Sequence, residues 1–493
     1  MRIAILLALA LAPAATSAAE RPNIIFMLAD DQGWGGTSVA MHPSIAFSKG
    51  DVFHTPHLEK LASQGMRFSA AYAPAPVCSP TRISIQTGKS PAQLHWTKAA
   101  PPVEGHQLTE PRLIKSIPSE EQTIGELLRK AGYATAHYGK WHIAGGGPES
   151  NGYDESDGDT GNENAFQFVD PNPVDIFGMA ERAEKFMAKS VKAGKPFYIQ
   201  MSWNALHASE NALKATLAKY ERLAQGDNTK RATVAAITED LDTGVGRLMA
   251  SIDRLGLTDD TYLFYMSDNG AGGGGGGGGK GGGGKGVSGL NGGKGDVWEG
   301  GIRVPLIVRG PGVKPNSWCH TRVVGYDLLP TFCQWAGVPT KSLPRGIEGG
   351  SIVDLLTHEG KGEVHRPREE LVFHFPHYQG LGGPQSAIYV GELKLMHFYE
   401  DDRDALFDLS KDIGERNDLA AKMPDEAARM RKQLDAYLAA VDAQFATPNS
   451  SFDPSKPLPP TKNGGDKKMN PKKTTGGMKK PGGNNGKKAK VSS

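Results

Sequence analysis

The sequence predicts an α/β fold in which helices sandwich a large, mixed and mostly parallel sheet. A smaller C-terminal α+β domain, made of an antiparallel sheet and a helix, is expected to follow. Short apolar runs at residues 23–29, 196–202 and 262–267 have the length of buried strands, and polar side chains follow each of them. Helical stretches separate these runs, which is the order that produces parallel strands. After residue 350, strand-like segments follow one another closely.

Three helices of the first domain are predicted by local signals. Thr55 is a plausible N-cap with Pro56 at the first helical position, which proline favours. Residues 123–130 predict a short helix that Gly132 would end. Residues 232–255 carry apolar side chains at helical spacing, so we expect a long amphipathic helix whose apolar stripe belongs to the core.

The change of character near residue 350 predicts a domain boundary. We expect a main α/β domain over residues 20–350 and a C-terminal α+β domain over residues 351–447. The strands and the closing helix of the second domain are expected at residues 371–375, 387–390, 393–398 and 425–441.

The N-terminus has the pattern of a signal peptide over residues 1–19. Arg2 supplies a positive charge, residues 3–10 a short apolar segment, and residues 17–19 a small-residue cleavage site. The apolar run is far shorter than the ~20 residues that a membrane span requires, so a membrane anchor is the weaker interpretation. We therefore expect an exported protein, periplasmic or secreted, without a membrane span.

Glycine and lysine are concentrated in two stretches of the 493-residue chain. Residues 272–286 contain thirteen glycines and two lysines, which predicts a mobile loop. Residues 455–493 contain eleven lysines and one aspartate; their net charge of +10 leaves −8 for residues 1–454, because the whole chain carries +2. We expect a basic, disordered tail over residues 448–493, which either contacts an anionic surface or polysaccharide or is a solvated extension. No nucleic-acid partner is expected.

Three cysteines are too few for a disulfide framework. Cys319 and Cys333 could pair in an oxidising compartment, which would leave Cys78 as the odd cysteine and favour a chemical role for it. Taken alone, a cysteine is more often a small buried apolar residue.

Polar side chains follow the first and the third apolar run. Asp30 and Asp31 follow the first, and Asp268 and Asn269 follow the third. Ligands of open α/β sheets bind beyond the carboxyl ends of the strands, so we expect these four residues to lie together. They offer oxygen ligands without imidazole or thiolate partners, a set that suits Ca²⁺ or Mg²⁺ rather than Zn²⁺. The alternative is an acid pair in a solvated turn.

Cys78 begins the sequence Cys-Ser-Pro-Thr-Arg, whose residues can start a helix. Ser79 would cap that helix, and Pro80 fits its first turn. A group at the start of a helix meets free N–H groups and the positive end of the dipole, which favours anions. Arg82 would neutralise such a group or hold it in place.

Four basic side chains are candidates for acting on an anionic substrate. Lys140 and His142 would share one face if they lay in a strand, because side chains alternate there. His207 follows the second apolar run, and Lys294 lies in a glycine-rich segment. Each of these residues alone would most often be a solvated or hydrogen-bonded side chain without a catalytic role. Together they match ester cleavage, in which a leaving alkoxide needs a proton and anionic oxygens need cations.

The pattern Cys-x-Pro-x-Arg at residues 78–82 resembles the signature of the type I sulfatases, the formylglycine-dependent, arylsulfatase-like family of the alkaline-phosphatase superfamily. The resemblance covers residues 21 to about 440, because further segments match the family in the same order. These segments are Asp30-Asp31 after the first strand and residues 55–58, 139–142, 268–270, 293–305 and 406–412.

The resemblance implies a sulfatase with a catalytic domain over residues 20–350. A formylglycine-generating maturation enzyme would oxidise Cys78 to formylglycine (3-oxoalanine). The hydrated aldehyde would attack sulfur with one hydroxyl and expel sulfate when the other loses its proton. The implied ligands of Ca²⁺ are Asp30, Asp31, Asp268, Asn269 and the converted Cys78. Arg82 and Lys140 would steady the formylglycine, His142 would assist sulfate release, and His207 and Lys294 would bind sulfate and protonate the leaving oxygen.

The expected substrate is a sulfated carbohydrate or an aryl sulfate. His374 and His377 lie in a segment that resembles one found in many bacterial polysaccharide sulfatases, and would contact substrate at the rim of the pocket. The alternative is a strand end with exposed histidines. Two other functions stay open: hydrolysis of phosphonate or phosphate esters with the same nucleophile, and glycan binding without catalysis by an unconverted Cys78.

Three features depart from the family pattern. The loop at residues 272–286 is nearly all glycine, whereas the family has a mixed composition there. Leu206 stands where proline is more usual, and the basic tail has no counterpart in the family.

Overall fold

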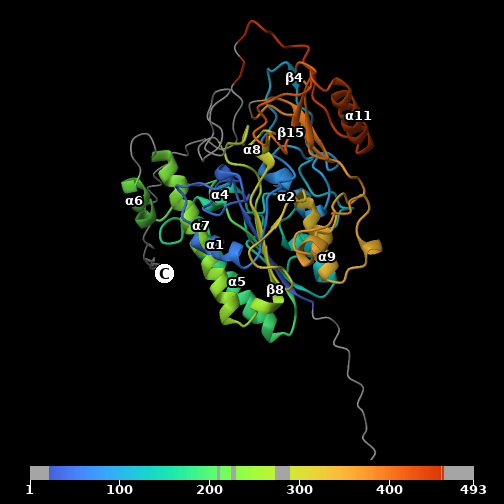
Figure 1. Ribbon diagram of the computed structural model, residues 1–493. Helices are drawn as coiled ribbons and strands as arrows, with labels where there is room; N and C mark the ends of the chain where they lie inside the picture. The colour runs from blue at the N-terminus through green and yellow to red at the C-terminus, as the bar shows by residue number, and fades with distance from the viewer. Residues whose placement is uncertain are drawn as a thin grey trace, which may run out of the picture.

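A computed structural model describes residues 21–207, 211–223, 229–272, 289–380, 382–456 and 458–459 (Figure 1). The expected signal peptide, all but Gly272 of the glycine-rich stretch, and most of the basic tail lie outside these residues, so the predictions about them stay predictions. Within the described residues, no helix is long and apolar enough to cross a membrane.

The centre of the molecule is an eight-stranded sheet with the order β10-β2-β9-β8-β1-β7-β5-β6. Its strands are β1 (Asn23–Ala29), β2 (Met66–Phe68), β5 (Ala134–Gly139), β6 (Glu155–Ser156), β7 (Phe197–Ser202), β8 (Thr261–Ser267), β9 (Leu306–Arg309) and β10 (Ser317–Cys319). β1 runs parallel to both of its neighbours, β7 and β8, whereas β9 runs antiparallel to β2 and β8. The predicted mixed, mostly parallel sheet is confirmed.

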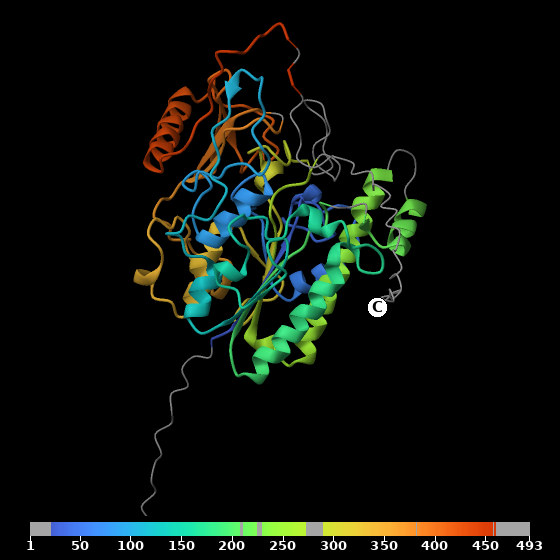
Figure 2. The same cartoon turned by 180° about the vertical axis from the view of Figure 1, so that it is seen from behind.

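Helices cover both faces of this sheet, which explains why its central strands are apolar along their whole length (Figure 2). The first face carries α1 (Pro56–Ser63), α5 (Ile176–Lys192) and α7 (Thr229–Arg254), and the second carries α2 (Cys78–Thr87), α3 (Ile124–Lys130), α9 (Leu328–Trp335) and α10 (Val353–Thr357).

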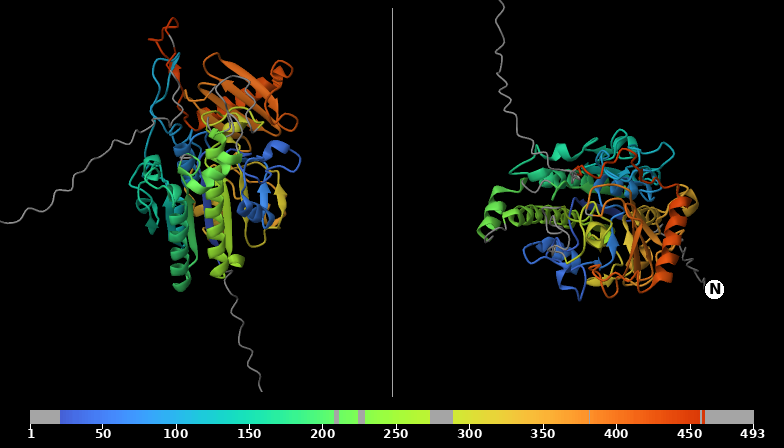
Figure 3. Two further views of the ribbon diagram at one scale, coloured as in Figure 1. Left: turned by 90° about the vertical axis from the view of Figure 1, so that its left-hand side faces the viewer. Right: turned by 90° about the horizontal axis from the view of Figure 1, so that it is seen from above.

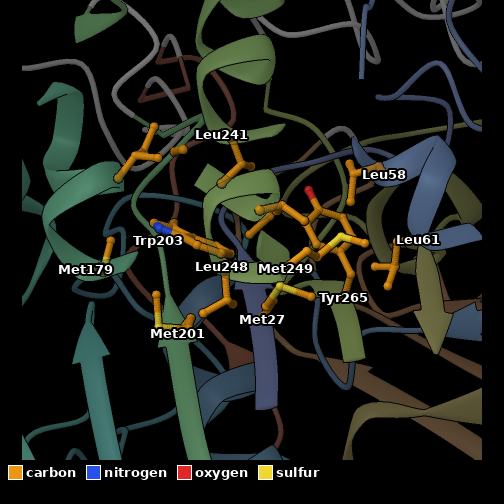
Figure 4. Close-up of a cluster of buried hydrophobic side chains, with 14 of the residues drawn as sticks. Met27, Leu58, Leu61, Met179, Met201, Trp203, Leu241, Leu248, Met249 and Tyr265 are labelled. Carbon is orange, nitrogen blue, oxygen red and sulfur yellow. The ribbon is translucent and has the colours of Figure 1, made fainter. Parts of the chain in front are cut away.

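Side chains alternate along β1 and so reach both cores. Met27 belongs to the core beneath α7, where Figure 4 shows it close to Leu248 and Met249. Phe26 points to the opposite core, where its ring lies 6.2 Å from that of Phe332 in α9.

The helix predictions for this part of the chain are confirmed, with small shifts at the ends. α1 begins at Pro56 after Thr55. The N-cap of α3 is Thr123, whose hydroxyl accepts a hydrogen bond from the Glu126 N–H while the Glu126 carboxylate accepts one from the Thr123 N–H. α7 begins at Thr229, earlier than the predicted residue 232.

A second sheet follows in the chain and is antiparallel throughout. Its strands, in spatial order, are β12 (Leu371–Phe375), β13 (Gln385–Val390), β14 (Leu393–Phe398) and β15 (Arg403–Asp408). Figure 3 shows it beyond the carboxyl ends of the main sheet, next to α11 (Pro424–Ala440). The predicted antiparallel sheet with a helix is confirmed, whereas the domain boundary at residue 350 stays a prediction.

This second sheet has an apolar core on each face. Leu434 of α11 packs with Leu395 on one face. On the other face Phe373 packs against Tyr72 of the main part of the chain, with ring centroids 5.8 Å apart. The sheet is therefore joined to the rest of the molecule by buried aromatic contacts.

The remaining elements are short. They are β3 (Ala71–Tyr72) paired with β11 (Val323–Val324), β4 (Leu108–Thr109) paired with β16 (Thr447–Pro448), α4 (Asn162–Ala165), α6 (Lys214–Leu223), α8 (Glu299–Ile302), and 3₁₀ turns at Ala46–Ser48, Glu149–Asn151, Pro173–Asp175, Thr258–Asp260, Gly325–Asp327 and Thr340–Ser342.

All three cysteines are buried free thiols. The pairing suggested for Cys319 and Cys333 is therefore not formed. Both belong to the core on the second face of the main sheet, where burial raises the pKa of Cys319 to about 11 and that of Cys333 to about 12. They are protonated, apolar core residues.

Candidate active site

The ends of two neighbouring strands bring the predicted acidic residues together. β1 and β8 are parallel, and Ala29 pairs with Ser267 at their carboxyl ends, so the next residues, Asp30 and Asp268, lie side by side. The backbone N–H of Asp31 donates to Asp268 Oδ1 at 3.2 Å. One carboxylate oxygen from each of Asp30, Asp31 and Asp268 lies within 4.8 Å of the others. The expected cluster is formed.

Each of these carboxylates has a basic partner. Lys140 Nζ lies 2.5 Å from Asp30 Oδ2. Lys294 Nζ contacts both oxygens of Asp31, at 2.6 and 2.8 Å. The guanidinium of Arg82 donates twice to Asp268 Oδ2, from Nε at 3.1 Å and from Nη2 at 2.7 Å. Three of the predicted basic residues thus converge on the three acids.

The cluster has the oxygen atoms that a hard cation needs. Within the described residues, Asp30 Oδ1 and Asn269 Oδ1 are buried and have no hydrogen-bond partner. The amide of Asn269 is oriented by its Nδ2, which donates to Asp31 Oδ1 at 2.7 Å. Unpaired buried oxygens are costly, and oxygen ligands of this kind suit Ca²⁺ or Mg²⁺. The residues fit such an ion.

The electrostatics of the two buried aspartates support this fit. Burial alone would raise the pKa of Asp30, but the charge of Lys140 and of the other basic groups holds it well below its usual range. Burial and the neighbouring Asp30 charge raise the pKa of Asp268, although Arg82 opposes them. A divalent cation between the two would offset both the burial of these carboxylates and their mutual repulsion.

Cys78 is the first residue of α2 and is buried. The N-cap is Val77, so the prediction that Ser79 caps the helix is wrong; Ser79 lies inside the first turn. Burial lowers the pKa of Arg82, but the charges of Asp268 and Asp30 raise it overall. Cys78 and Arg82 lie four residues apart in α2, so their side chains share one face of the helix.

Lys140 and His142 reach the site from a turn. β5 ends at Gly139, and His142 has a left-handed backbone conformation with φ of 54°, so the predicted strand alternation does not apply. Burial, together with the charges of Lys140 and Arg82, lowers the pKa of His142 well below its usual value. Its Nδ1 is buried and has no hydrogen-bond partner in the part of the chain that the structure describes.

His207 and Lys294 complete the set of basic residues. Burial lowers the pKa of His207 to about 4, even though the Asp30 charge acts in the opposite direction. Burial also lowers the pKa of Lys294, but the charges of Asp31 and Asp30 raise it overall. Near pH 7 the site thus combines a neutral imidazole with a charged ammonium group.

Sequence reasoning missed Thr160, which holds the turn that carries Lys140 and His142. Its hydroxyl donates to the Gly139 carbonyl at 2.5 Å and accepts from the Trp141 N–H at 3.0 Å. Its carbonyl accepts from the His142 N–H at 2.8 Å. Thr160 is remote from these residues in sequence and lies in no motif, so only the folded chain identifies it.

His374 and His377 are both buried, so the alternative of a strand end with exposed histidines is wrong, whereas their contact with substrate stays a prediction. His374 Nδ1 is 2.6 Å from Ser386 Oγ, and its Nε2 is 2.8 Å from the Gln444 carbonyl. His377 Nδ1 is 2.8 Å from Glu110 Oε2, and its Nε2 is 2.7 Å from Thr97 Oγ1. Both rings are buried and use both nitrogens, because they lie in the packed end of the second sheet.

The surroundings of Cys78 suit an anionic ester. Charged lysine and arginine side chains can stabilise anionic oxygens, and neutral imidazoles can accept or pass on protons. Together with the position beyond the carboxyl ends of a mostly parallel sheet, these features indicate a hydrolase of anionic esters.

Comparison with known proteins narrows this class. Residues 22–338 match the family model described as Sulfatase, and residues 293–444 match the model described as N-sulphoglucosamine sulphohydrolase, C-terminal. Because the first match spans more than half of the chain, the chain belongs to the sulfatase family. It is an enzyme that hydrolyses sulfate esters.

Relatives with similar sequences and folds agree with this assignment. The chain is 28% identical to human (Homo sapiens) arylsulfatase A over 92% of this chain and 93% of that protein. It is also 28% identical to the N-acetylgalactosamine-6-sulfatase of Sus scrofa, over 78% of this chain and 73% of that protein. The crystal structure of Ps i-CgsB superposes with a TM-score of 0.70 at 23% identity, covering 86% of this chain and 94% of that chain.

Proposed function

We propose that this sulfatase removes sulfate from a sulfated carbohydrate, with a formylglycine made from Cys78 as its nucleophile and Ca²⁺ as its metal. The observation that carries the proposal is the position of Cys78 at the start of α2, one helical turn before Arg82, whose guanidinium binds Asp268 of the acidic cluster. A helix start favours anionic groups, and the cluster supplies oxygen ligands for a cation.

The proposed metal ligands are Asp30, Asp31, Asp268, Asn269 and the converted Cys78. The two unpartnered oxygens, Asp30 Oδ1 and Asn269 Oδ1, support this set. When bound, Ca²⁺ supplies positive charge that stabilises the anionic oxygens of the substrate. Arg82 and Lys140 would keep Asp268 and Asp30 in place through their short contacts.

The remaining basic residues have distinct proposed roles. His142 Nδ1 makes no hydrogen bond within the described residues, and its lowered pKa keeps it neutral, so it can accept a proton when sulfate leaves. Lys294 stays charged and would bind a sulfate oxygen. His207, which is neutral near pH 7, would donate a hydrogen bond from its ring N–H to the leaving oxygen.

Names of related proteins support a carbohydrate substrate. One relative is described as N-acetylgalactosamine-6-sulfatase. Ps i-CgsB has also been crystallised in complex with k-i-k-neocarrahexaose, with a TM-score of 0.70 to this chain.

The test is sulfate release from defined sulfated mono- and oligosaccharides and from 4-nitrophenyl sulfate, with mass spectrometry of the peptide that contains Cys78. We expect turnover by material in which Cys78 is converted to formylglycine, and none by Cys78→Ala. Turnover by protein with unconverted Cys78 would show that formylglycine is not the nucleophile. Faster cleavage of an aryl phosphonate than of the aryl sulfate would favour the phosphonate hydrolase.

Export of the protein is part of the same proposal. It is supported by the charged, apolar and small-residue segments of residues 1–19. N-terminal sequencing of protein from the periplasm or the medium should show a mature chain that begins after residue 19. An uncleaved N-terminus on cytoplasmic protein would contradict export.

A further inference from the structure

A cavity of about 280 Å³ lies beside the proposed active site, at the carboxyl ends of β5 and β7. Gly139, which precedes Lys140, lines it. So does Asn204, whose carbonyl accepts a hydrogen bond from the His207 N–H at 3.0 Å. The opposite wall comes from α4, the residues after it and the first turns of α5. A ligand in this cavity would therefore touch the turns that carry Lys140 and His207.

The lining suits a ligand rich in hydroxyl groups. Asn164, Gln167 and Asn204 contribute amides, which both donate and accept hydrogen bonds, and Phe168 contributes an apolar surface. Gln167 is exposed, and its side chain makes no hydrogen bond to any described residue. Its amide is therefore available to a ligand. The volume is close to ~300 Å³, the lower end of the range for small-molecule sites.

The charges in the cavity disfavour a second sulfate. Asp157, Asp175 and Arg182 all line it, and Arg182 Nη2 contacts Asp157 Oδ2 at 2.8 Å and Asp175 Oδ2 at 2.5 Å. Two carboxylates thus share one guanidinium, which leaves an excess of negative charge. An anionic group would be repelled, whereas a neutral sugar would not.

We propose that this cavity is a subsite for an unsulfated sugar residue next to the sulfated one. The inference rests on the proposed function, because it assumes that the ester sulfate is bound at Cys78. The preferred substrate would then be an oligosaccharide with a sulfated unit joined to a neutral unit. Monosaccharide sulfates and aryl sulfates would leave the subsite empty.

The test compares Gln167→Ala with wild type and with Glu163→Ala. Glu163 is a matched control, since it is exposed on α4 and does not line the cavity. The substrates are 4-nitrophenyl sulfate, a panel of singly sulfated monosaccharides, the disaccharides that add a neutral sugar to each, and disaccharides sulfated on both units. Thermal unfolding checks that each variant is folded.

We expect wild type to have a higher kcat/KM for disaccharides with a neutral unit than for the matching monosaccharides. Gln167→Ala should raise KM for these disaccharides by about fivefold, the loss expected for one hydrogen bond, and leave the other substrates unchanged. Glu163→Ala should behave as wild type on every substrate.

Three outcomes would overturn the subsite: equal kcat/KM for monosaccharides and disaccharides in wild type, the same change in Gln167→Ala for every substrate, or a preference for disaccharides sulfated on both units. Failure of the proposed function gives a different result, because wild type would then hydrolyse 4-nitrophenyl sulfate but release sulfate from none of the sulfated monosaccharides or disaccharides.

Discussion

Cys78 is a small side chain whose position matters for chemistry more than for packing. It is buried at the start of α2, close to Arg82, and it belongs to none of the large apolar clusters of the described residues. Cys333 is equally buried, but it lies inside the core between α9 and the main sheet. The two thiols therefore provide a matched pair, one at the site and one in the core.

We expect Cys78→Ala to lower kcat/KM for 4-nitrophenyl sulfate by about a thousandfold or more, because it removes the proposed nucleophile. Its free energy of unfolding should change by only ~1 kcal/mol, since little volume is lost. Cys333→Ala, the control, should lose a similar amount of stability and keep its activity. Comparable activity losses in both variants would argue against a catalytic Cys78.

The acidic cluster predicts that Ca²⁺ stabilises the folded protein independently of catalysis. Removing divalent ions with a chelator should lower the thermal unfolding temperature, and added Ca²⁺ should restore it. At a Ca²⁺ concentration a hundredfold above Kd the gain is ~2.7 kcal/mol. Asp30→Asn should lose this response, because it removes a charge from the buried set.

The matched control for the metal prediction is Asp253→Asn. Asp253 has a side chain that is 44% exposed and lies outside the cluster, so the variant should keep the full response to Ca²⁺. An unfolding temperature that is the same with and without Ca²⁺ in wild type would show that these residues do not bind the ion.

At the scale of single elements, β12 shows how a histidine in a promising segment becomes structural. His374 alternates with Phe373 and Phe375 along the strand and points away from the core that these aromatic side chains share with Tyr72. Its ring is held instead by Ser386 of β13 and by the Gln444 carbonyl after α11. The strand, rather than a substrate, accounts for its hydrogen bonds.

The burial of His374 predicts a loss of stability in mild acid. Burial lowers the pKa of His374 from 6.5 to about 4, although the hydrogen bond with the Gln444 carbonyl acts in the opposite direction. Between these two values the unfolded chain binds a proton that the folded protein does not, so the free energy of unfolding falls as the pH falls from 6.5 towards 4. Urea unfolding across this window should show a shallower pH dependence for His374→Asn than for wild type.

Exposed His358 provides the control for this pH prediction. His358→Asn should retain the wild-type pH dependence, since the His358 side chain is exposed to solvent in the folded protein, as it is in the unfolded chain. An unchanged slope in His374→Asn would show that other groups, such as the neighbouring His377, cause the loss.

At the scale of the whole molecule, a buried ionic network joins the second sheet to the segment that follows Lys294. Glu299 of α8 accepts from Arg303 Nε at 2.6 Å and from Lys394 Nζ of β14 at 3.2 Å. Lys394 Nζ also contacts Glu415 Oε1 at 2.6 Å. Since α8 follows Lys294 closely in the chain, the second sheet supports the position of a proposed catalytic residue.

We expect Lys394→Met to lower the free energy of unfolding by ~3–5 kcal/mol, because two buried carboxylates would lose their shared cation. The double variant Lys394→Met/Glu415→Gln should recover part of this loss, since one unpaired charge is then neutralised. Urea unfolding measures the free energy of unfolding of the single and the double variant. Lys411→Met is the control, because Lys411 pairs with Asp408 at the surface and its loss should change the free energy of unfolding only slightly.

A smaller loss in Lys394→Met than in Lys411→Met would contradict the role of the buried network. An unfolding transition that splits into two steps would show that the second sheet can unfold separately from the main sheet.

Much of the architecture could be predicted because the signals were local. The apolar runs ended in polar residues, and β1 and β8 then placed Asp30 beside Asp268, as parallel neighbours must. Helix starts at Thr55 and Thr123 depended on their own flanking residues. The start of α2 was misjudged by two residues, because both Val77 and Ser79 can precede a helical turn and only packing decides between them.

The sequence by itself determined the fold class, the family resemblance and the residue types that gather around Cys78, because spacing within short motifs encodes them. The tertiary structure alone decided which side chains are paired, buried or free. It placed Thr160 beside His142, buried His374 and His377 at one end of the second sheet, and opened a cavity next to Asn204. These outcomes depend on contacts between residues far apart in the chain, whose geometry no local pattern contains.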